Sequence, residues 1–257
     1  MSKDSKKFNS VNPLISIITV IYNGDRYFEQ TIKSVIGQTY KNIEYIIIDG
    51  GSTDGTHDIV SKYEKHISCF VSEPDEGLYD AMNKGISLAK GQLVGMINSD
   101  DWYELNAVEL MVDAYRNNPE KTIFHADRFD INSNEKKELR KFNPSAFKFK
   151  YIGMTYNHPS MFVAKSEYER HQYKIDLSAL SDYLFVLESF LFKEDAIFYV
   201  EKPIVNYRLD GISAQLSLMK RLEEGFSARR IAKMGMLENI FSVLLRATIF
   251  SIKKFIT

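Results

Sequence analysis

The sequence predicts an α/β fold, in which a central, mostly parallel sheet is flanked by helices and followed by a C-terminal helical extension. Short apolar runs rich in β-branched residues alternate with segments whose apolar residues recur at helical spacing. Strands and helices that alternate in this way form parallel sheets with right-handed crossovers. Polar clusters follow the apolar runs, and ligands of such sheets bind beyond the carboxyl ends of the strands.

Four strands and the helices between them are predicted in the first half of the chain. Each apolar run is short enough for a buried strand and is followed by Gly, Asn, Asp or Pro, which interrupt regular structure. Strands are expected at 14–21, 43–48, 67–71 and 93–97, and helices at 27–38, 56–63, 78–89 and 106–117.

The alternation fades after about residue 120. A lysine- and asparagine-rich stretch at 132–150 is expected to form an exposed excursion. Strands are expected at 123–126, 161–163 and 196–200, and a helix at 178–192.

Composition sets the class of protein. The chain has 257 residues, of which 44% are hydrophobic, which suits one large α/β domain or one domain with a small appendage. The net charge of -1 gives no case for nucleic-acid binding. A single cysteine, Cys69, excludes an intrachain disulfide and fits a reducing compartment. The polar N-terminus does not resemble a secretory signal, and we expect a cytoplasmic protein.

The last forty residues differ from the rest. From Lys220 on, eight basic and three acidic residues give a net charge of +5. The stretch 240–256 is apolar but is broken by Arg246, Lys253 and Lys254, a pattern typical of a helix that lies on a membrane surface rather than spanning it. The alternative is a helix packed on the domain or on a second subunit.

Four polar clusters are expected to meet at one edge of the sheet, because each follows a predicted strand. They are 22–23, 49–54, 73–76 and 98–101. The last contains Asp100 and Asp101, adjacent acids that repel unless a cation or hydrogen bonds relieve them. A divalent metal that holds a diphosphate is one solution. The alternative is a solvated turn in which an Asp caps the next helix.

These segments together resemble family 2 glycosyltransferases with a GT-A fold, the Rossmann-like nucleotide-diphospho-sugar transferase fold, including the bacterial colanic-acid-type polysaccharide enzymes. The resemblance is dense over residues 14–115 and looser to about 213. The matching motifs are SIITVIYN (16–23), QTY (38–40), EYIIIDGGSTDGT (44–56), DAMNKGI (80–86), Gly91 and NSDD (98–101). The resemblance implies a polar tail (1–12), a GT-A domain (13–213) with a nucleotide-binding half (13–118) and an acceptor half (119–213), and a basic amphipathic helical segment (214–257).

The resemblance also implies where the metal and the donor bind. Asp100 matches the carboxylate that holds Mn²⁺ or Mg²⁺ against the diphosphate, and Asp101 would bind the metal through water or orient Asp100. The nucleotide sugar is expected at Tyr22, Asn23, Asp49, Ser52, Asp54, Asp75, Asn83, Lys84, Asn98, Ser99 and Arg208.

The chain departs from the family pattern at two of these places. Asn98 stands where many members have Asp, which lowers the charge offered to the metal. Gly50 stands where the family often has the acid that recognises the base, so Asp49 or a backbone carbonyl would have to replace it. Alternatives remain open for Tyr22, which could pack in the core, and for Lys84, which could be a solvated helix residue.

The general base of an inverting reaction is expected before a helix in the acceptor half. Asp182 fits this position by resemblance, and its alternative role is to cap that helix; Asp176 and Glu188 are weaker candidates. His158 would bind the acceptor, the phosphates or a structural partner. Asp210 could supply a metal ligand where members often have His after the Tyr-Arg pair.

The function that the resemblance implies is transfer of a sugar, from UDP-hexose or UDP-N-acetylhexosamine, to a glycan or lipid-linked glycan acceptor with inversion. The setting would be bacterial surface polysaccharide synthesis at the cytoplasmic face of the inner membrane, with the C-terminal helices on the membrane or in a homo-oligomer. A nucleotidyltransferase is the second hypothesis. Such enzymes usually carry a glycine-rich loop after the first strand, whereas the corresponding loop of this chain, 22–26, is poor in glycine. A degenerate sugar-nucleotide-binding or assembly protein is the third.

Overall fold

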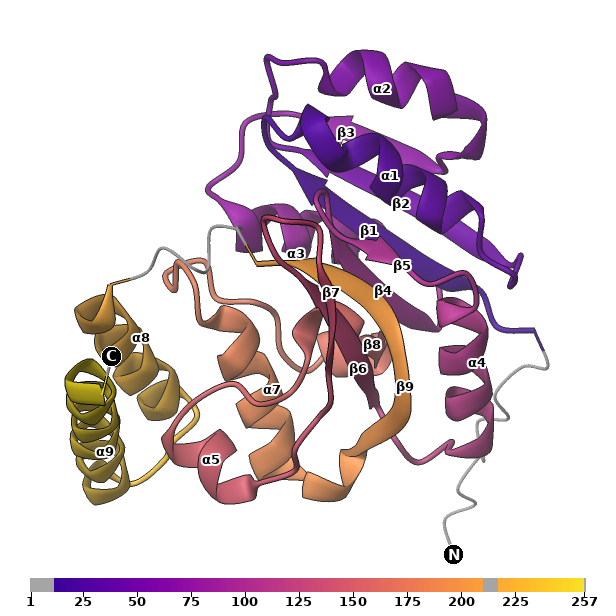
Figure 1. Cartoon of the computed structure of the whole chain (residues 1–257). Coiled ribbons are helices and arrows are strands. Elements are labelled where there is room, and N and C mark those ends of the chain that lie inside the picture. Colours follow the sequence, from indigo (N-terminus) through magenta and orange to yellow (C-terminus); the bar gives the residue numbers. More distant parts are fainter. Residues whose placement is uncertain (1–11, 210–216, 257) are drawn as a thin grey trace, which may run out of the picture.

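A curled sheet with helices on both faces forms the body of the protein (Figure 1). The computed structural model describes residues 12–209 and 217–256, with only the backbone of 253–256. Within these residues the sheet has nine strands in the order β3-β2-β1-β4-β8-β6-β9-β5, and β7 pairs with β6. The strands are β1 (Ile15–Ile21), β2 (Ile43–Asp49), β3 (Cys69–Ser72), β4 (Leu93–Asn98), β5 (Trp102–Tyr103), β6 (Ile123–Ile131), β7 (Lys137–Arg140), β8 (Phe162–Ala164) and β9 (Ile197–Arg208).

The helices connect these strands and close the chain. They are α1 (Asp25–Ile36), α2 (Thr56–Tyr63), α3 (Leu78–Leu88), α4 (Ala107–Asn117), α5 (Ala146–Tyr151), α6 (Lys165–Tyr168), α7 (Ser181–Phe192), α8 (Leu218–Ile231) and α9 (Met236–Ile256). Short 3-10 turns lie at Glu64–His66, His158–Ser160 and Glu194–Ala196. The α/β prediction is therefore confirmed.

The first four long strands are parallel, and the second half of the sheet is mixed. β1 lies between β2 and β4 and pairs in parallel with both, and β2 pairs in parallel with β3. β8 then pairs antiparallel with β4 and β6, whereas β6 and β9 are parallel. The carboxyl ends of β1, β2, β3 and β4 consequently lie at one edge, as the sequence predicts.

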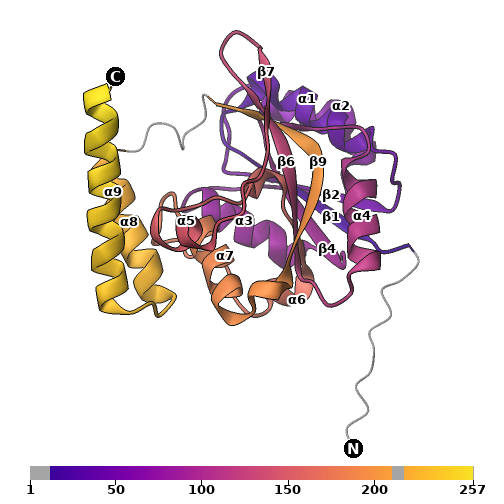
Figure 2. The same cartoon turned by 60° about the horizontal axis from the view of Figure 1, so that its bottom comes forward.

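Alternate residues of the buried strands serve two cores, because successive side chains in a strand point to opposite faces. Ile15 and Ile17 of β1 pack in a core with α1 and α4, while Ile18 and Val20 pack in a core with α3 and α7. Figure 2 shows these two layers of helices on either side of the strands. Buried strands of this kind need apolar residues at every position, which explains why their sequences are continuous apolar runs.

Two expectations for the second half hold only in part. Most of 132–150 is exposed as predicted, but α5 inserts Phe149, which is fully buried between Tyr183 and Phe190. The last strand is much longer than 196–200, since β9 continues to Arg208 beside β6 after a β-bulge near Ala126. A bulge shifts the alternation of apolar residues, so sequence periodicity does not follow the strand through it.

The C-terminal helices α8 and α9 lie side by side at one edge of the molecule (Figures 1 and 2). α9 also packs on α5, where the Ser242 hydroxyl donates to the Tyr151 carbonyl oxygen at 2.5 Å. Its outer face remains open, and Leu237 and Leu244 are 83% and 62% exposed. Among the described residues, no helix has an apolar run sufficient to cross a membrane. The predicted polar N-terminal tail (1–12) falls almost wholly outside the described residues.

Candidate functional site

The polar clusters after the strands do meet at one edge of the sheet. Asn23, which follows β1, adopts a left-handed backbone conformation (φ 48°) that asparagine tolerates. Its backbone N–H donates to Ser52 Oγ at 2.8 Å, and its Oδ1 accepts from the Thr53 N–H at 2.8 Å. The loops after β1 and β2 are therefore held together by Asn23 and Ser52, both of which the sequence assigns to the site.

Asp49 holds the loop after β2 from inside the protein. Its side chain is fully buried, and its oxygens accept from Ser52, Ser72 and His57. Burial alone would raise the pKa of Asp49, but these hydrogen bonds outweigh it and the pKa is lowered. Both oxygens accept hydrogen bonds from protein donors, so Asp49 holds this loop in place.

Asp54 has a similar anchoring position. Its Oδ2 accepts from the Asp25 backbone N–H at 3.0 Å, at the start of α1, and its Oδ1 accepts from the Thr56 N–H at 3.1 Å, at the start of α2. These bonds satisfy backbone donors that helix starts leave without partners. Asp54 therefore fixes both helices against the loops of the site.

Gly50 leaves a space that Asp75 fills. A Cβ atom at Gly50 would lie 2.6 Å from Asp75 Oδ2 and 3.3 Å from Tyr22 Cδ2. The Asp75 carboxylate thus stands where a side chain at position 50 would stand, with the Tyr22 ring beside it. Tyr22 is 67% exposed, so the alternative that it packs in the core is wrong. Together they form an aromatic face next to a hydrogen-bond acceptor.

Asn83 and Lys84 of α3 make protein contacts. The Asn83 amide donates to the Tyr173 carbonyl at 2.9 Å and accepts from the Tyr173 N–H at 3.1 Å, which ties the two halves of the domain together. The Lys84 ammonium lies 2.9 Å from Glu73 and 3.3 Å from Asp80. Lys84 is half-buried at the loop that carries Asp75. The amide of Asn83 instead bonds the Tyr173 backbone, away from that loop.

The NSDD motif lies at the end of β4, where the Asp101 side chain is buried and the Asp100 side chain is partly exposed. Asp101 is 1% exposed; its Oδ1 accepts from the Arg208 N–H at 2.9 Å and its Oδ2 from the Asn98 amide at 3.0 Å. Burial, and next to it the charge of Asp100, raise the pKa of Asp101 well above its usual range. An Asp at position 98 would add a third carboxylate here, so Asn98 has a clear electrostatic role. Ser99 lies at the same turn, where its carbonyl accepts from Thr31.

Arg208 is engaged with the protein on every side. Its Nε donates to the Asp100 carbonyl at 3.1 Å, its Nη1 to Glu135 at 2.7 Å, and its guanidinium lies 3.7 Å from the Tyr27 ring centroid. It is 5% exposed. In this arrangement Arg208 positions the turn that carries Asp100, and a diphosphate contact would require it to leave Glu135. The neighbouring candidate Asp210 lies outside the described residues.

A pocket of about 820 Å³ extends from this turn into the second half of the domain. Asn98 lines one part of it, and Asp182, at the start of α7, lines the same pocket. Asp182 Oδ1 accepts from the Tyr183 N–H at 2.7 Å, but the cap position is Leu180, so Asp182 stands in the first turn of α7 and does not cap it. Its side chain remains partly exposed. Asp182 therefore lines the pocket from the first turn of α7.

Two tyrosines that the sequence does not single out link Asp182 to His158. The Tyr79 hydroxyl donates to Asp182 Oδ1 at 3.3 Å, and the Tyr79 ring stacks on Tyr173 at 5.5 Å between centroids. The Tyr173 hydroxyl is 2.9 Å from His158 Nε2. Burial lowers the pKa of His158, which favours the neutral ring. Tyr79 precedes the DAMNKG motif directly, but nothing in its spacing indicates the partner across the pocket.

The described residues contain no group of three or more His, Cys, Asp or Glu arranged to hold a metal ion. A metal at this edge would therefore take few ligands from these residues. Asp100 is the partly exposed carboxylate at the end of β4, and its repulsion with the buried Asp101 is of the kind that a divalent cation relieves. The donor set fits a cation that shares its coordination with a bound diphosphate.

Comparison with known proteins gives a consistent result. Residues 16–171 match the family model described as glycosyl transferase family 2. The putative glycosyltransferase EpsH of Bacillus subtilis is 26% identical over 229 residues, which cover 82% of this chain and 65% of that protein. The putative teichuronic acid biosynthesis glycosyltransferase TuaG of the same organism is 38% identical over 104 residues, 39% of this chain and 41% of TuaG.

Solved structures show the same fold at low sequence identity. S. aureus TarS 1–349 in complex with UDP-GlcNAc matches with a TM-score of 0.67 and 16% identity, over 85% of this chain and 65% of that one. The mannosyltransferase PcManGT of Pyrobaculum calidifontis, in complex with GDP-Man and Mn²⁺, matches with a TM-score of 0.61 and 14% identity, over 87% and 65%. These neighbours are GT-A proteins, so the predicted GT-A fold is confirmed. The chain spans a third to two thirds of the length of the first curated relatives.

Proposed function

The chain belongs to glycosyl transferase family 2, and we propose that it transfers a sugar from a UDP-sugar to a glycan acceptor with inversion at the anomeric carbon. The observation that carries this proposal is the single pocket that runs from Asn98, beside the NSDD turn, to Asp182. A donor at the sheet edge and an acceptor in the pocket would meet between these residues. A nucleotidyltransferase is no longer needed to explain the motifs.

Tyr22 and Asp75 are proposed to bind the base of the donor. A uracil ring offers a flat face and one N–H donor, and the space above Gly50 offers an exposed aromatic ring and a carboxylate acceptor. Asp75 would thus replace the acid that Gly50 lacks. TarS 1–349 forms a complex with UDP-GlcNAc, which supports the proposal of a uridine nucleotide here, and Ser52, Asn23 and Asp54 would shape the loops around it.

Asp100 is proposed to hold Mn²⁺ or Mg²⁺ together with the donor diphosphate, and PcManGT binds Mn²⁺ on the same fold. The cation would neutralise charge on the leaving nucleoside diphosphate. Asp101, Asn98 and Arg208 would then act through Asp100, because their hydrogen bonds fix the turn that presents it.

Asp182 is proposed as the general base. Its carboxylate takes the proton of the acceptor hydroxyl while that oxygen attacks the anomeric carbon from the face opposite the nucleotide. The bond from the anomeric carbon to the β-phosphate oxygen breaks, and UDP leaves with the electron pair. Tyr79 donates to the same oxygen that the Tyr183 N–H reaches, so the second oxygen of Asp182 is left to face the acceptor.

The acceptor would be a glycan or lipid-linked glycan of a bacterial surface polysaccharide. TuaG supports this setting by its described role in teichuronic acid biosynthesis. The exposed leucines of α9 would rest on the cytoplasmic face of the membrane, or on a second copy of the chain.

The test is metal-dependent release of UDP. Purified protein with Mn²⁺ should hydrolyse at least one member of a panel of UDP-hexoses and UDP-N-acetylhexosamines, and should bind UDP by calorimetry. Absence of both activities across the panel would reject the proposal. UDP binding without any turnover, with or without acceptor extracts, would favour a non-catalytic sugar-nucleotide-binding protein.

A further inference from the structure

Two arginines of the C-terminal helices are buried with donor groups that have no partner. Arg229 of α8 is fully buried; its Nε donates to Asn239 Oδ1 at 3.0 Å, but its Nη1 and Nη2 have no hydrogen-bond partner. Arg246 of α9 also has a buried Nη1 without a partner. Buried guanidinium groups are normally paired with an acid or fully hydrogen-bonded, whereas the group that faces both arginines is the Tyr183 hydroxyl, which carries no negative charge of its own.

The two guanidinium groups converge on one point. A Cβ atom on Gly225 would clash with Arg246 Nη1 and would lie 3.3 Å from Arg229 Nη2. Glycine is unfavourable inside a helix, so its presence in the middle of α8 is explained by the space that these two nitrogens need. Like charges this close repel each other. Burial, and after it the positive charge of Arg229, lowers the pKa of Arg246.

The acidic residues of these helices do not neutralise the pair. Glu224 directs its oxygens to the backbone N–H groups of Ser178, Ala179 and Leu180 and to Lys220. Glu238 accepts from the Tyr151 hydroxyl and from the Gly235 N–H. Glu223 is exposed. Within residues 12–209 and 217–252 neither arginine forms an ion pair, so a compensating negative charge must come from outside this part of the chain.

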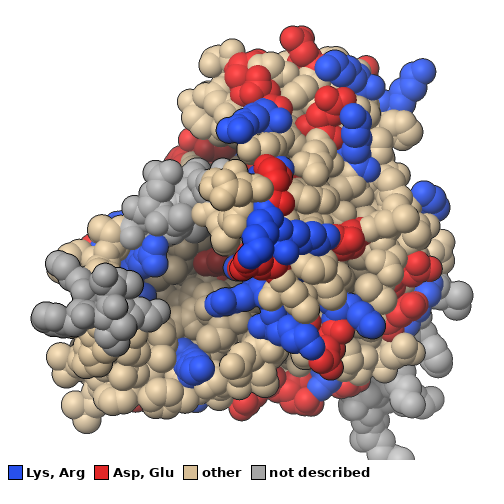
Figure 3. All heavy atoms as spheres, viewed as in Figure 1, with Lys and Arg blue, Asp and Glu red and all other residues tan. Residues whose placement is uncertain are grey.

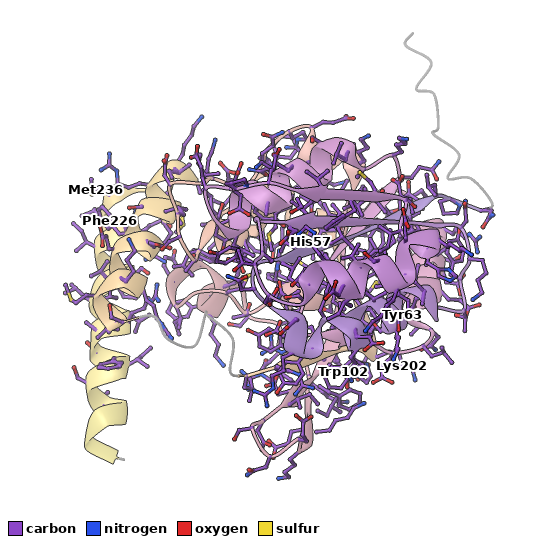
Figure 4. All side chains as sticks on the ribbon, turned by 90° about the horizontal axis from the view of Figure 1, so that it is seen from above. His57, Tyr63, Trp102, Lys202, Phe226 and Met236 are labelled. Carbon is purple, nitrogen blue, oxygen red and sulfur yellow. The ribbon has the colours of Figure 1, made fainter. Side chains whose placement is uncertain are left out.

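Arg246 lines the pocket that contains Asp182. Of the described side chains that line this pocket, one is a carboxylate, Asp182, and six are cationic: Arg128, Arg140, Lys141, Lys148, Arg221 and Arg246. Figure 3 shows the hollow beside the C-terminal helices with Lys and Arg side chains around it. Figure 4 shows Phe226 and Met236 on these helices, at the side of the molecule away from Tyr63.

We propose that the α8–α9 end of this pocket, formed around Arg246 and Arg229, binds a phosphate group carried by the acceptor. Arg246 lines the pocket, so a phosphate there would accept from its planar guanidinium group, while the buried Arg229 lies behind it and adds positive charge. The proposal rests on the proposed function in that it assigns the class of acceptor for the same pocket. The phosphate could belong to a lipid diphosphate or to a sugar phosphate. Because α9 has an exposed apolar face, we expect the lipid diphosphate to bind more tightly.

The experiment measures phosphate binding with the nucleotide edge already filled by UDP and Mn²⁺. The probes are geranyl diphosphate and glucose 1-phosphate, titrated by calorimetry into the full-length protein. Arg246→Gln should weaken binding of at least one probe by about tenfold or more, because a charge-assisted pair of hydrogen bonds is lost. UDP affinity should be unchanged.

Arg230→Gln is the matched control, since Arg230 is an exposed arginine on the neighbouring helix α8. It should bind both probes as the unmodified protein does. Arg246→Gln is preferred to Arg229→Gln because it leaves the buried Arg229–Asn239 hydrogen bond in place. The probe should also raise the unfolding temperature of the unmodified protein and not that of Arg246→Gln, a readout that separates binding from a structural defect.

Two outcomes overturn the proposal: neither probe binds the UDP-loaded protein, or both bind Arg246→Gln as tightly as the unmodified chain. Failure of the proposed function has a different signature, namely loss of UDP binding and turnover while the phosphate probe still binds through Arg246. Tighter binding of geranyl diphosphate than of glucose 1-phosphate would assign the phosphate to a lipid-linked acceptor, and the reverse to a phosphate within a soluble glycan.

Discussion

His125 provides a test of how the aromatic cluster behind the pocket residue Tyr156 is built. It lies in β6, is 1% exposed, and sits among the rings of Phe142, Tyr156 and Tyr199, with centroids 4.4, 4.9 and 5.2 Å away. Its Nδ1 has no partner, and burial lowers the pKa of His125 from 6.5 to about 3. We expect the pH dependence of stability to change when His125 is replaced by Phe.

The sign follows from the proton balance. Between its unfolded pKa of 6.5 and its folded value of about 3, His125 is protonated in the unfolded chain and neutral in the folded one. The contribution of the neutral, buried His125 to the free energy of unfolding is therefore fully present above pH 6.5 and is lost as the pH falls toward its folded pKa of about 3. Each pH unit in this window is worth about 1.4 kcal/mol, so His125 alone accounts for a loss of about 2 kcal/mol between about pH 7.5 and about pH 5. For a protein of this size that corresponds to about 4–8 °C in unfolding temperature.

The assay is urea unfolding of the unmodified protein and of His125→Phe at both pH values. Fitting a larger ring costs the variant a roughly constant amount, about 1–3 kcal/mol, at both pH values. The difference between the two proteins should therefore shrink by about 2 kcal/mol on going to the lower pH. His66→Gln, at an exposed histidine, should follow the unmodified protein. Parallel loss of stability in the unmodified protein and His125→Phe would refute the neutral, buried histidine.

Three further predictions concern the site and the C-terminal helix. Asp75→Ala should weaken UDP binding by about 10- to 100-fold in calorimetry, because a charged acceptor is lost from the base, while Asp58→Ala at an exposed helix position should not; equal affinities would contradict the base site. Asp182→Asn should lower turnover by about 10²- to 10⁴-fold and leave UDP affinity intact, and retained turnover would exclude Asp182 as the base. Replacing Leu237 and Leu244 together by Gln should release the protein from anionic vesicles in a flotation assay without changing UDP binding, whereas unchanged flotation would leave the packing or dimer interpretation.

The fold and the edge that carries the site were predictable because they depend on local signals. Continuous apolar runs gave β1, β2 and β4 to within one residue, and the parallel register that follows from them brings 22–23, 49–54 and 98–101 together. The second half was less predictable for physical reasons. β9 passes a bulge that breaks its periodicity, and α5 buries Phe149 within a sequence rich in Lys and Asn.

Residue roles depend on contacts that sequence order does not indicate. Asp49, Asp54, Asn83 and Asp101 have the residue types expected of a ligand site, yet their polar atoms are used to hold loops in place. Whether an acid faces a ligand or a backbone N–H depends on a shift of a few ångströms in the loop. A family pattern therefore finds the loops of a site more reliably than it separates binding residues from positioning residues.

Gly50 illustrates how a missing group can be supplied from elsewhere. The parallel pairing of β2 with β3 places Asp49 opposite Ser72, so the loop that leaves β3 passes directly over Gly50. The absence of a side chain there is what allows Asp75 Oδ2 to stand 2.6 Å from the Cβ position, and an Asp at 50 would clash with it. Position 50 and position 75 are thus alternatives for one carboxylate. A Gly50→Asp, Asp75→Gly double variant should accordingly bind UDP better than Asp75→Gly alone, and failure to recover affinity would show that the two positions are not equivalent.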